Sequence, residues 1–145
     1  MSLFSSLSVS ASGMEAQRER AQILVENLAN ADTTRTAEGG PYRRRDVVFQ
    51  SANTSSPFSS VLDSQLSTQG QGVQVSQIVT DTSEPDRRYM PGHPDADKDG
   101  YVAFPRVNPA EDMVDLLGAQ RAYGANVSAI AAVKDMIQRS IDLFR

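Results

Sequence analysis

The stretch Asn108–Phe144, NPAEDMVDLLGAQRAYGANVSAIAAVKDMIQRSIDLF, decides the fold because it predicts one uninterrupted amphipathic helix. Asn108 is a good N-cap, Pro109 suits the first helical position, and Glu111 completes a capping box. A helix of about 36 residues is about 54 Å long. A compact globule of this chain length has a radius of gyration of only about 15 Å. Much of the helix's apolar face would therefore extend beyond such a globule and must be covered by something outside it.

Two apolar stripes run along this helix, about 100° apart. The first is large: Met113, Leu116, Tyr123, Val127, Ile130, Ile137, Ile141 and Phe144. The second is mostly small: Ala119, Ala122, Asn126, Ala129, Val133, Met136, Ser140 and Leu143. A wide core face is the ordinary explanation, but the remaining chain is too short to bury both stripes. We expect the N-terminal helix to cover one stripe and a neighbouring subunit to cover the second, small one, where small residues allow close approach.

A second helix is predicted from Leu3 to Asn30, with its apolar residues on one face. Its serine-rich first half has poor helix propensity, so we expect it to order only on packing. Gln120 and Lys134 interrupt the large stripe of the C-terminal helix, as polar residues that fix coiled-coil register do. The candidate subunit-interface residues are Leu3, Leu7, Met14, Ala21, Leu24, Leu28, Met113, Leu116, Gln120, Tyr123, Val127, Ile130, Val133, Lys134, Ile137, Ile141 and Phe144.

The middle of the chain has a different texture, with short β-type runs between polar loops. Strands are predicted around Val47–Phe49, Val73–Val79 and Tyr101–Phe104. The predicted fold class is therefore α+β: long N- and C-terminal helices pair as a coiled coil, with a small loop-rich β module between them. The expected parts are residues 1–35 for the first helix, 36–107 for the β module and 108–145 for the second helix.

Composition excludes several classes of function. The chain has 14 basic and 18 acidic residues and a net charge of -4, which gives no general attraction to nucleic acid or anionic lipid. No apolar run is long enough for a membrane span. The N-terminal stretch has no Lys or Arg before Arg18, so we do not expect a cleavable signal peptide. The absence of cysteine excludes disulfides and thiolate chemistry.

Local motifs give little sign of catalysis. The segment Asp95–Gly100, DADKDG, matches the start of an EF-hand calcium loop. Arg106 stands at the twelfth position, where calcium needs a bidentate Glu, so we expect a tight Asp/Gly turn instead. The run Arg43–Arg45 and the pair Arg87–Arg88 are expected to be solvated or subunit-contacting strand edges rather than phosphate sites. No catalytic residue, metal site or cofactor is predicted.

Two alternatives stay open from the residues alone. One is a regulatory binding module with a degenerate calcium loop and a coiled-coil dimer. The other is a hydrolase that uses Asp95, Asp97 and His93, the only histidine in the chain.

Several segments resemble bacterial flagellar axial proteins. They are ASGMEAQR at 11–18, ENLANADTT at 26–34, GGPYRR at 39–44, GHPDAD at 92–97 and QRAY at 120–123. Their order and the short length narrow the resemblance to the basal-body rod family of the FlgC type. The motif residues are Asn27, Asn30, Thr33, Gly39, Gly40, Pro41, Tyr42, Gly92, His93, Pro94, Asp95, Asp97, Gly100 and Tyr101. The chain departs from the family at Glu26 and Arg106, where Asn is common.

The resemblance implies a structural subunit of the proximal rod, the drive shaft that crosses the periplasm in the flagellar basal body. Such proteins are exported unfolded by the flagellar type III export apparatus and polymerise through their terminal helices, with the central module outside. The implied partners are other flagellar rod proteins and copies of the chain itself, the FliE adaptor, and the surrounding P and L rings. No cofactor, nucleic acid or direct membrane span is implied.

Overall fold

The computed structural model describes residues 3–52 and 71–143, so Phe144, a predicted interface residue, lies outside the described residues. The described elements are α1 (Leu3–Ala29), β1 (Arg45–Ala52), β2 (Gly72–Thr80), β3 (Asp86–Tyr89), β4 (Tyr101–Phe104) and α3 (Pro109–Leu143). This content confirms the predicted α+β class. None of the described helices is long and apolar enough to cross a membrane.

The ends of the two long helices follow from local hydrogen bonds. The side-chain Oδ1 of Asn108 accepts from the backbone N–H of Ala110 at 3.2 Å, which confirms Asn108 as the N-cap of α3. The N–H of Asp112 donates to the carbonyl of Asn108 at 3.0 Å and closes the first helical turn. At the end of α1, the Asn30 side-chain amide donates to the carbonyl of Glu26 at 2.9 Å, so one of the last free carbonyls has a partner.

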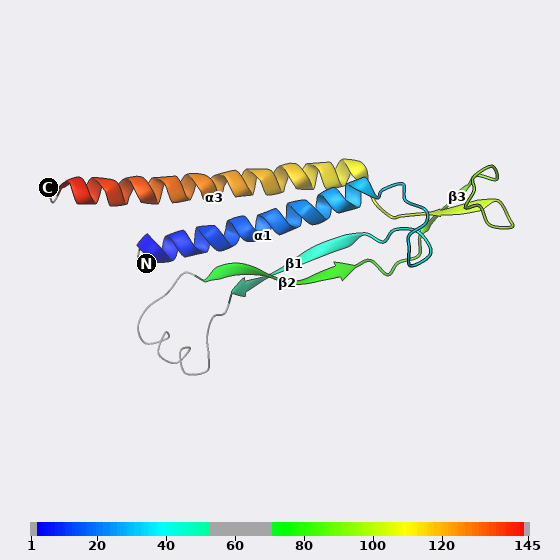
Figure 1. Cartoon of the computed structure of the whole chain (residues 1–145), viewed down its shortest axis with the longest axis horizontal. Coiled ribbons are helices and arrows are strands. Elements are labelled where there is room, and N and C mark those ends of the chain that lie inside the picture. The colour runs from blue at the N-terminus through cyan, green and yellow to red at the C-terminus, as the bar shows by residue number, and fades with distance from the viewer. Residues whose placement is uncertain (1–2, 53–70, 144–145) are drawn as a thin grey trace, which may run out of the picture. The chain divides into compact units, whose positions relative to one another are not determined.

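The chain divides into two compact units, each of which takes part of both helices. Unit 1 contains Met1–Glu19, Phe49–Ser76 and Ala119–Arg145, and unit 2 contains Arg20–Val48 and Gln77–Gly118. Within each unit, the α1 segment lies beside the α3 segment and runs in the opposite direction (Figure 1). In unit 1, a Cβ added to Gly13 would lie 3.1 Å from the Nδ2 of Asn126, so the two helices approach closely there. In unit 2, Arg20 pairs with Asp115 at 3.4 Å.

Two short β ribbons account for the described strands. β1 pairs with β2, and β3 pairs with β4 in antiparallel register from Asp86↔Phe104 to Tyr89↔Tyr101. β4 buries Val102 and Phe104 on one face, as its alternation predicted. The predicted strands near residues 47, 75 and 102 are confirmed as β1, β2 and β4. The sequence did not predict β3, because all four of its residues are exposed and three are charged.

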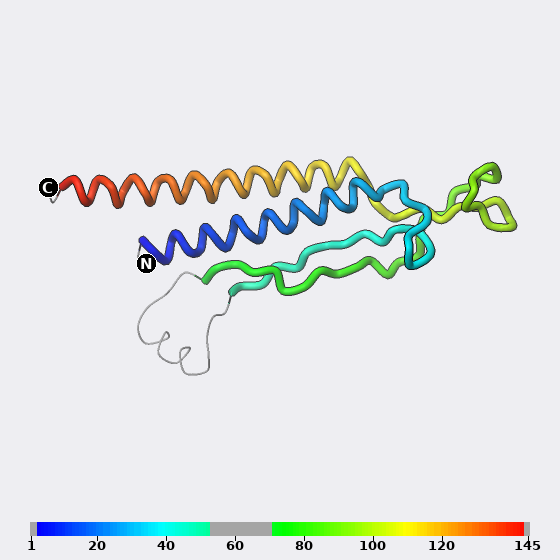
Figure 2. Tube along the Cα trace, viewed as in Figure 1, coloured from blue at the N-terminus to red at the C-terminus, as the bar shows by residue number. Residues whose placement is uncertain are grey.

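The connection from α1 to β1 is a compact turn stabilised by backbone hydrogen bonds (Figure 2). The N–H of Thr36 donates to the carbonyl of Gly40 at 2.8 Å, and the N–H of Tyr42 donates to the carbonyl of Thr33 at 3.0 Å. Gly39 and Gly40 have φ values of 88° and 79°. This left-handed backbone favours glycine, so the geometry of the turn accounts for both Gly39 and Gly40.

Candidate subunit interface

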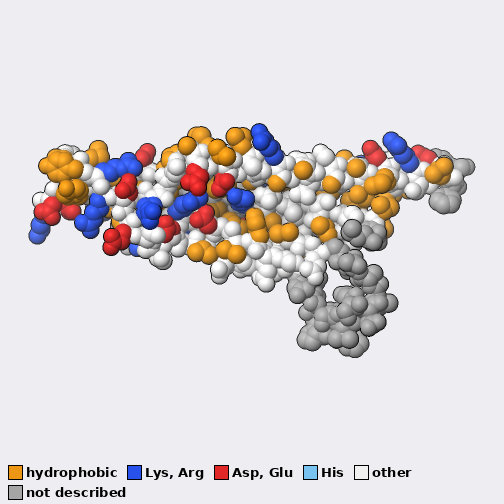
Figure 3. Space-filling model, turned by 180° about the vertical axis from the view of Figure 1, so that it is seen from behind, with side chains coloured by type: hydrophobic (Ala, Val, Ile, Leu, Met, Phe, Trp, Pro, Cys, Tyr) orange, Lys and Arg blue, Asp and Glu red, His pale blue; other side chains and the backbone are white. Residues whose placement is uncertain are grey.

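α3 carries large apolar side chains that the rest of the described chain leaves exposed. Their exposed fractions range from 42% for Tyr123 to 86% for Leu143. Apolar side chains reach the surface between charged groups (Figure 3). The exposed large apolar residues of α3 are Met113, Val114, Leu117, Tyr123, Val127, Met136, Ile141 and Leu143. Scattered exposed apolar residues are normal, but eight on one helix make α3 the candidate interaction surface.

The large stripe of α3 is only partly covered within the chain. Leu116, Ile130 and Ile137 are half-buried, whereas Met113, Tyr123, Val127 and Ile141 are exposed. Gln120 and Lys134, the polar residues within this stripe, are also exposed.

The small stripe includes the most buried positions of α3 in unit 1. Ala119 is 1% exposed and Val133 is 8% exposed, while Ala122 and Asn126 are half-buried. The expectation that the small stripe is left for a neighbour is therefore wrong at Ala119 and Val133. The other residues of the small stripe, Ala129, Met136, Ser140 and Leu143, are exposed.

The predicted interface residues of α1 are mostly used inside the chain. Leu24 is buried and Leu3 is exposed. Leu7, Met14, Ala21 and Leu28 are half-buried. Two further apolar residues of α1 are exposed and were not predicted as interface residues: Phe4, at 78% exposure, and Val25. Phe4 is three residues before Leu7, and Val25 is four residues after Ala21 and three before Leu28, so helical spacing could have identified both.

Asn27 is the centre of a buried polar junction in unit 2. Its side chain is fully buried, and its Nδ2 donates to the carbonyl of Arg45 at 2.8 Å. Its Oδ1 accepts from the N–H of Arg45 at 3.0 Å and from the hydroxyl of Tyr42 at 2.9 Å. The amide thus bonds both backbone groups of the first residue of β1, as a neighbouring strand would. Burial raises the pKa of the Tyr42 hydroxyl, while nearby Arg45 opposes the shift.

Two arginines next to Tyr42 link β1 to both helices. The Nη1 of Arg45 lies 2.9 Å from the Oε2 of Glu26 in α1. The Nη2 of Arg44 lies 3.0 Å from the Oδ1 of Asp112 in α3, and Asp112 is 1% exposed. The expectation of a solvated or subunit-contacting edge at 43–45 is therefore wrong for Arg44, which pairs with a buried carboxylate, whereas the Arg45 side chain is 39% exposed and stays partly solvated. The sequence offered no sign that Glu26 and Asp112, distant in the chain, would converge on this run.

The segment Asp95–Gly100 is a tight turn, as expected. The Oδ1 of Asp97 accepts from the N–H of Asp99 and from the N–H of Tyr101, both at 2.9 Å. Gly100 has a φ of 81°, and β4 starts at the next residue. Within the ranges that the structure describes, no cluster of three or more His, Cys, Asp or Glu could hold a metal ion. The prediction of an Asp/Gly turn is confirmed.

This turn is anchored to the segment that follows α1. The Oδ2 of Asp95 accepts from the Thr34 hydroxyl at 2.8 Å, and Arg35 lies 3.7 Å from its Oδ1. The Nδ1 of His93 accepts from the N–H of Asp95 at 3.1 Å, and the His93 ring meets Phe104 edge to face. His93 is thus a loop-stabilising residue.

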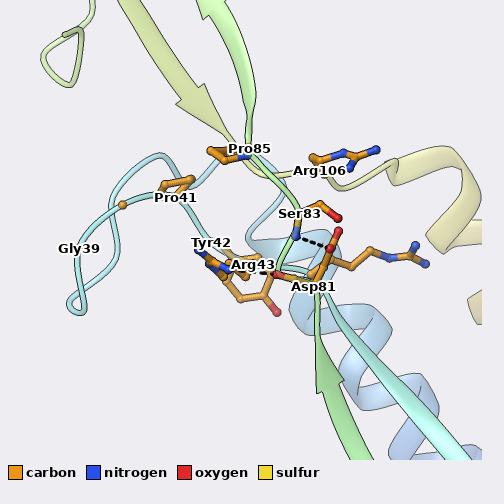
Figure 4. A pocket seen from close by; sticks show the side chains of 10 residues that line it. Gly39, Pro41, Tyr42, Arg43, Asp81, Ser83, Pro85 and Arg106 are labelled. Carbon is orange, nitrogen blue, oxygen red and sulfur yellow. Dashed lines mark hydrogen bonds between the residues drawn. The ribbon is translucent and has the colours of Figure 1, made fainter.

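A pocket in unit 2 lies beside the glycine turn (Figure 4). Its lining residues are Gly39, Gly40, Pro41, Tyr42, Arg43, Arg44, Asp81, Ser83, Pro85 and Arg106. Hydrogen bonds from the Ser83 side chain and from the Ser83 backbone N–H, which lies 2.8 Å from the Oδ1 of Asp81, lower the pKa of this exposed carboxyl. The Nη1 of Arg43 donates to the Asp81 carbonyl at 3.5 Å. The lining contains no histidine, lysine or cysteine, so the pocket gives little support to catalysis.

Comparison with known proteins identifies the family of the chain. A protein named flagellar basal-body rod protein FlgC from Bacillus subtilis (strain 168) is 45% identical over 150 residues, with 99% of each chain covered. The chain belongs to the FlgC family of flagellar basal-body rod proteins. The FlgC protein of Borreliella burgdorferi is 39% identical over all of this chain, and that of Salmonella typhimurium (strain LT2) is 32% identical over 99% of it. The family model described as flagellar basal body rod FlgEFG protein C-terminal matches residues 98–143.

Membership in the FlgC family confirms the predicted function. The chain is a structural subunit of the bacterial flagellar basal-body rod, and it is not an enzyme. The hydrolase and the regulatory binding module with a degenerate calcium loop are therefore wrong as alternatives. The matched region 98–143 includes β4 and all of α3, the helix with the larger number of exposed large apolar residues.

Proposed function

We propose that the chain polymerises into the proximal rod through α1 and α3, which pair as a coiled coil within the subunit. The observation that carries this proposal is the exposed apolar surface of α3, from Met113 to Leu143. Full burial of one large apolar side chain contributes about 1.5–3 kcal/mol. Several of these side chains shared between neighbours would hold a long assembly together.

The two stripes of α3 take different partners in this proposal. The small stripe, with Ala119 and Val133 buried, faces the chain's own α1. The exposed part of the large stripe, with Tyr123 and Val127 at its centre, faces a neighbouring subunit. Gln120 lies within the exposed surface, as does Lys134, where polar side chains restrict the register of neighbouring helices. Residues 1–35 and 108–145 then form the assembly domain, and 36–107 form the module outside it.

The proposed neighbours are copies of the chain and other rod proteins, arranged by heterologous contacts that do not close into a ring. Family membership supports the finer assignments as proposals: the FliE adaptor and the P and L rings as further partners, the flagellar type III apparatus as the export route without a cleavable signal peptide, and the periplasmic rod as the location. The mechanical role follows from the same contacts, because long helices that share apolar layers resist torsion together.

The test compares two substitutions at adjacent positions of α3. Val127→Asp puts a charge into the exposed apolar surface, whereas Ser128→Asp puts the same charge on the neighbouring polar side of the helix. Both residues are exposed, so both variants are expected to fold like the unmodified chain, as judged by far-ultraviolet circular dichroism. In cells that lack the native chain, Val127→Asp is expected to abolish swimming and incorporation into purified basal bodies. Ser128→Asp is expected to retain both.

Normal swimming with Val127→Asp would contradict the proposal. Equal loss in the two variants would also contradict it, because the effect would then come from charge on α3 in general and not from the apolar surface.

A further inference from the structure

The ion pair between Arg44 and Asp112 is buried but incompletely satisfied. The Asp112 side chain is 1% exposed, and the Arg44 side chain is 23% exposed. The Oδ2 of Asp112 and the Nε of Arg44 are buried and have no hydrogen-bond partner in the part of the chain that the structure describes. Arg44 also lies 3.5 Å from Asp46, so two carboxylates share one guanidinium. Such a pair loses hydration without recovering all of its hydrogen bonds.

The electrostatics of the pair indicate that it is costly. Burial raises the pKa of Asp112, and the neighbouring carboxylates of Asp46 and Glu111 act in the same direction, while Arg44 opposes them. The charged form of Asp112 is therefore disfavoured in this environment. Replacing a buried ion pair of this kind with packed apolar residues is often neutral or stabilising, whereas removing one partner is strongly destabilising.

The position of the pair gives it a role other than stability. Asp112 lies in the first turn of α3, and Arg44 directly precedes β1. The next residue, Arg45, is bonded to Glu26 and Asn27 of α1. Two consecutive residues, Arg44 and Arg45, therefore connect α1, β1 and α3 within unit 2 and fix their positions along one another. A shift of α3 along its axis would break the 3.0 Å contact between Arg44 and Asp112.

We infer that Arg44 and Asp112 are positioning residues that fix the register of α3 against β1 and α1, at a cost in stability. The inference rests on the proposed role of α3 in assembly, because register fixes which apolar residues a neighbouring subunit meets. Apolar packing tolerates several registers, whereas an ion pair at this site selects one.

The test replaces the pair with apolar residues of similar size in the full-length chain. The variants are Arg44→Met, Asp112→Leu and the double variant. The matched control is the double variant Arg20→Met with Asp115→Leu, which changes a more exposed ion pair that also involves the start of α3 in the same unit. Three quantities are measured: the urea midpoint of unfolding, the number of amide signals per residue in unit 2 by NMR, and incorporation into the basal body in cells.

Each single variant is expected to lower the urea midpoint, and the double variant is expected to match or exceed the unmodified chain. The double variant is also expected to show more than one amide signal for residues around Arg45, and to lose incorporation into the rod. The control is expected to change none of the three quantities.

A double variant that is unfolded, or less stable than either single variant, would overturn the inference, because the pair would then be a net stabiliser. A stable double variant with single amide signals and normal incorporation would overturn it too, because apolar packing would then select the register alone. These outcomes differ from failure of the proposed function, in which Val127→Asp leaves assembly intact.

Discussion

Asn27→Ala is the substitution whose effect on stability can be worked out most directly from the structure. The fully buried amide makes three hydrogen bonds, to the N–H and carbonyl of Arg45 and to the hydroxyl of Tyr42. Alanine leaves all three partners unpaired. An unpaired buried polar group costs about 1–3 kcal/mol. Arg45 and Tyr42 are half-buried, so water recovers part of this cost. The expected loss is about 3 kcal/mol, at the low end of this range for three groups.

The assay is equilibrium urea unfolding, followed by tyrosine fluorescence. Three of the four tyrosines, Tyr42, Tyr89 and Tyr101, belong to unit 2, and the chain has no tryptophan. The signal therefore reports mainly on the unit that contains Asn27. A loss of about 3 kcal/mol is a large part of the 5–15 kcal/mol typical of a domain, so the midpoint should fall clearly.

Asn30→Ala is the matched control for this prediction. Asn30 is half-buried, lies one turn further along, and donates to the carbonyl of Glu26. The Asn30 Oδ1 also accepts from the Thr33 hydroxyl at 3.2 Å, so removal of the side chain loses two hydrogen bonds and is expected to cost about 1–2 kcal/mol. If Asn27→Ala lost no more stability than Asn30→Ala, the claim that Asn27 organises the junction would be refuted.

Three further predictions concern other sites. Gly40→Ala is expected to lower the free energy of unfolding by about 1–2 kcal/mol, because the φ of Gly40 is 79°. Gly118→Ala is expected to raise it by about 0.5–1 kcal/mol, because an added Cβ at this position of α3 meets open space. Urea unfolding in which Gly40→Ala is the more stable of the two variants would contradict this backbone argument. Calorimetric titration is expected to show no micromolar calcium binding, because Asp97 and Asp95 already accept hydrogen bonds; binding at that level would contradict the turn assignment. The pKa of Asp112 is raised in the folded chain, so its contribution to stability is present below the ordinary Asp pKa and is lost as pH rises through the pKa of the folded state. The unmodified chain should therefore lose stability relative to Asp112→Asn across that pH window. A stability difference between the two chains that stays constant with pH would contradict this prediction.

The elements with strong local signals could be predicted from the sequence. The N-cap at Asn108 and the periodicity of both helices placed α1 and α3 to within a residue or so, and alternation identified β4. β3 escaped prediction because an exposed strand of charged residues has no apolar alternation. β3 forms through its pairing with β4 and not through an apolar alternation in its own sequence.

The junction could not be predicted, for a different reason. In the sequence, Arg44 is only one member of a basic run. The role of such a run depends on which residues lie opposite it in the fold. The partner of Arg44, Asp112, is 68 residues away along the chain, in the first turn of α3. Which stripe of α3 is buried within the chain also depends on packing. Both stripes are apolar, so their sequences do not show that Ala119 is buried while Val127 is exposed.

We propose that the exposed apolar surface of α3 is the contact between rod subunits. A density map of the assembled basal body, traced to side chains, tests this most directly. Met113, Tyr123, Val127 and Ile141 are expected to be buried against a helix of another subunit, while Ser128 stays outside that contact. A map in which these four side chains face solvent, and subunits meet only through the β3–β4 ribbon, would contradict it.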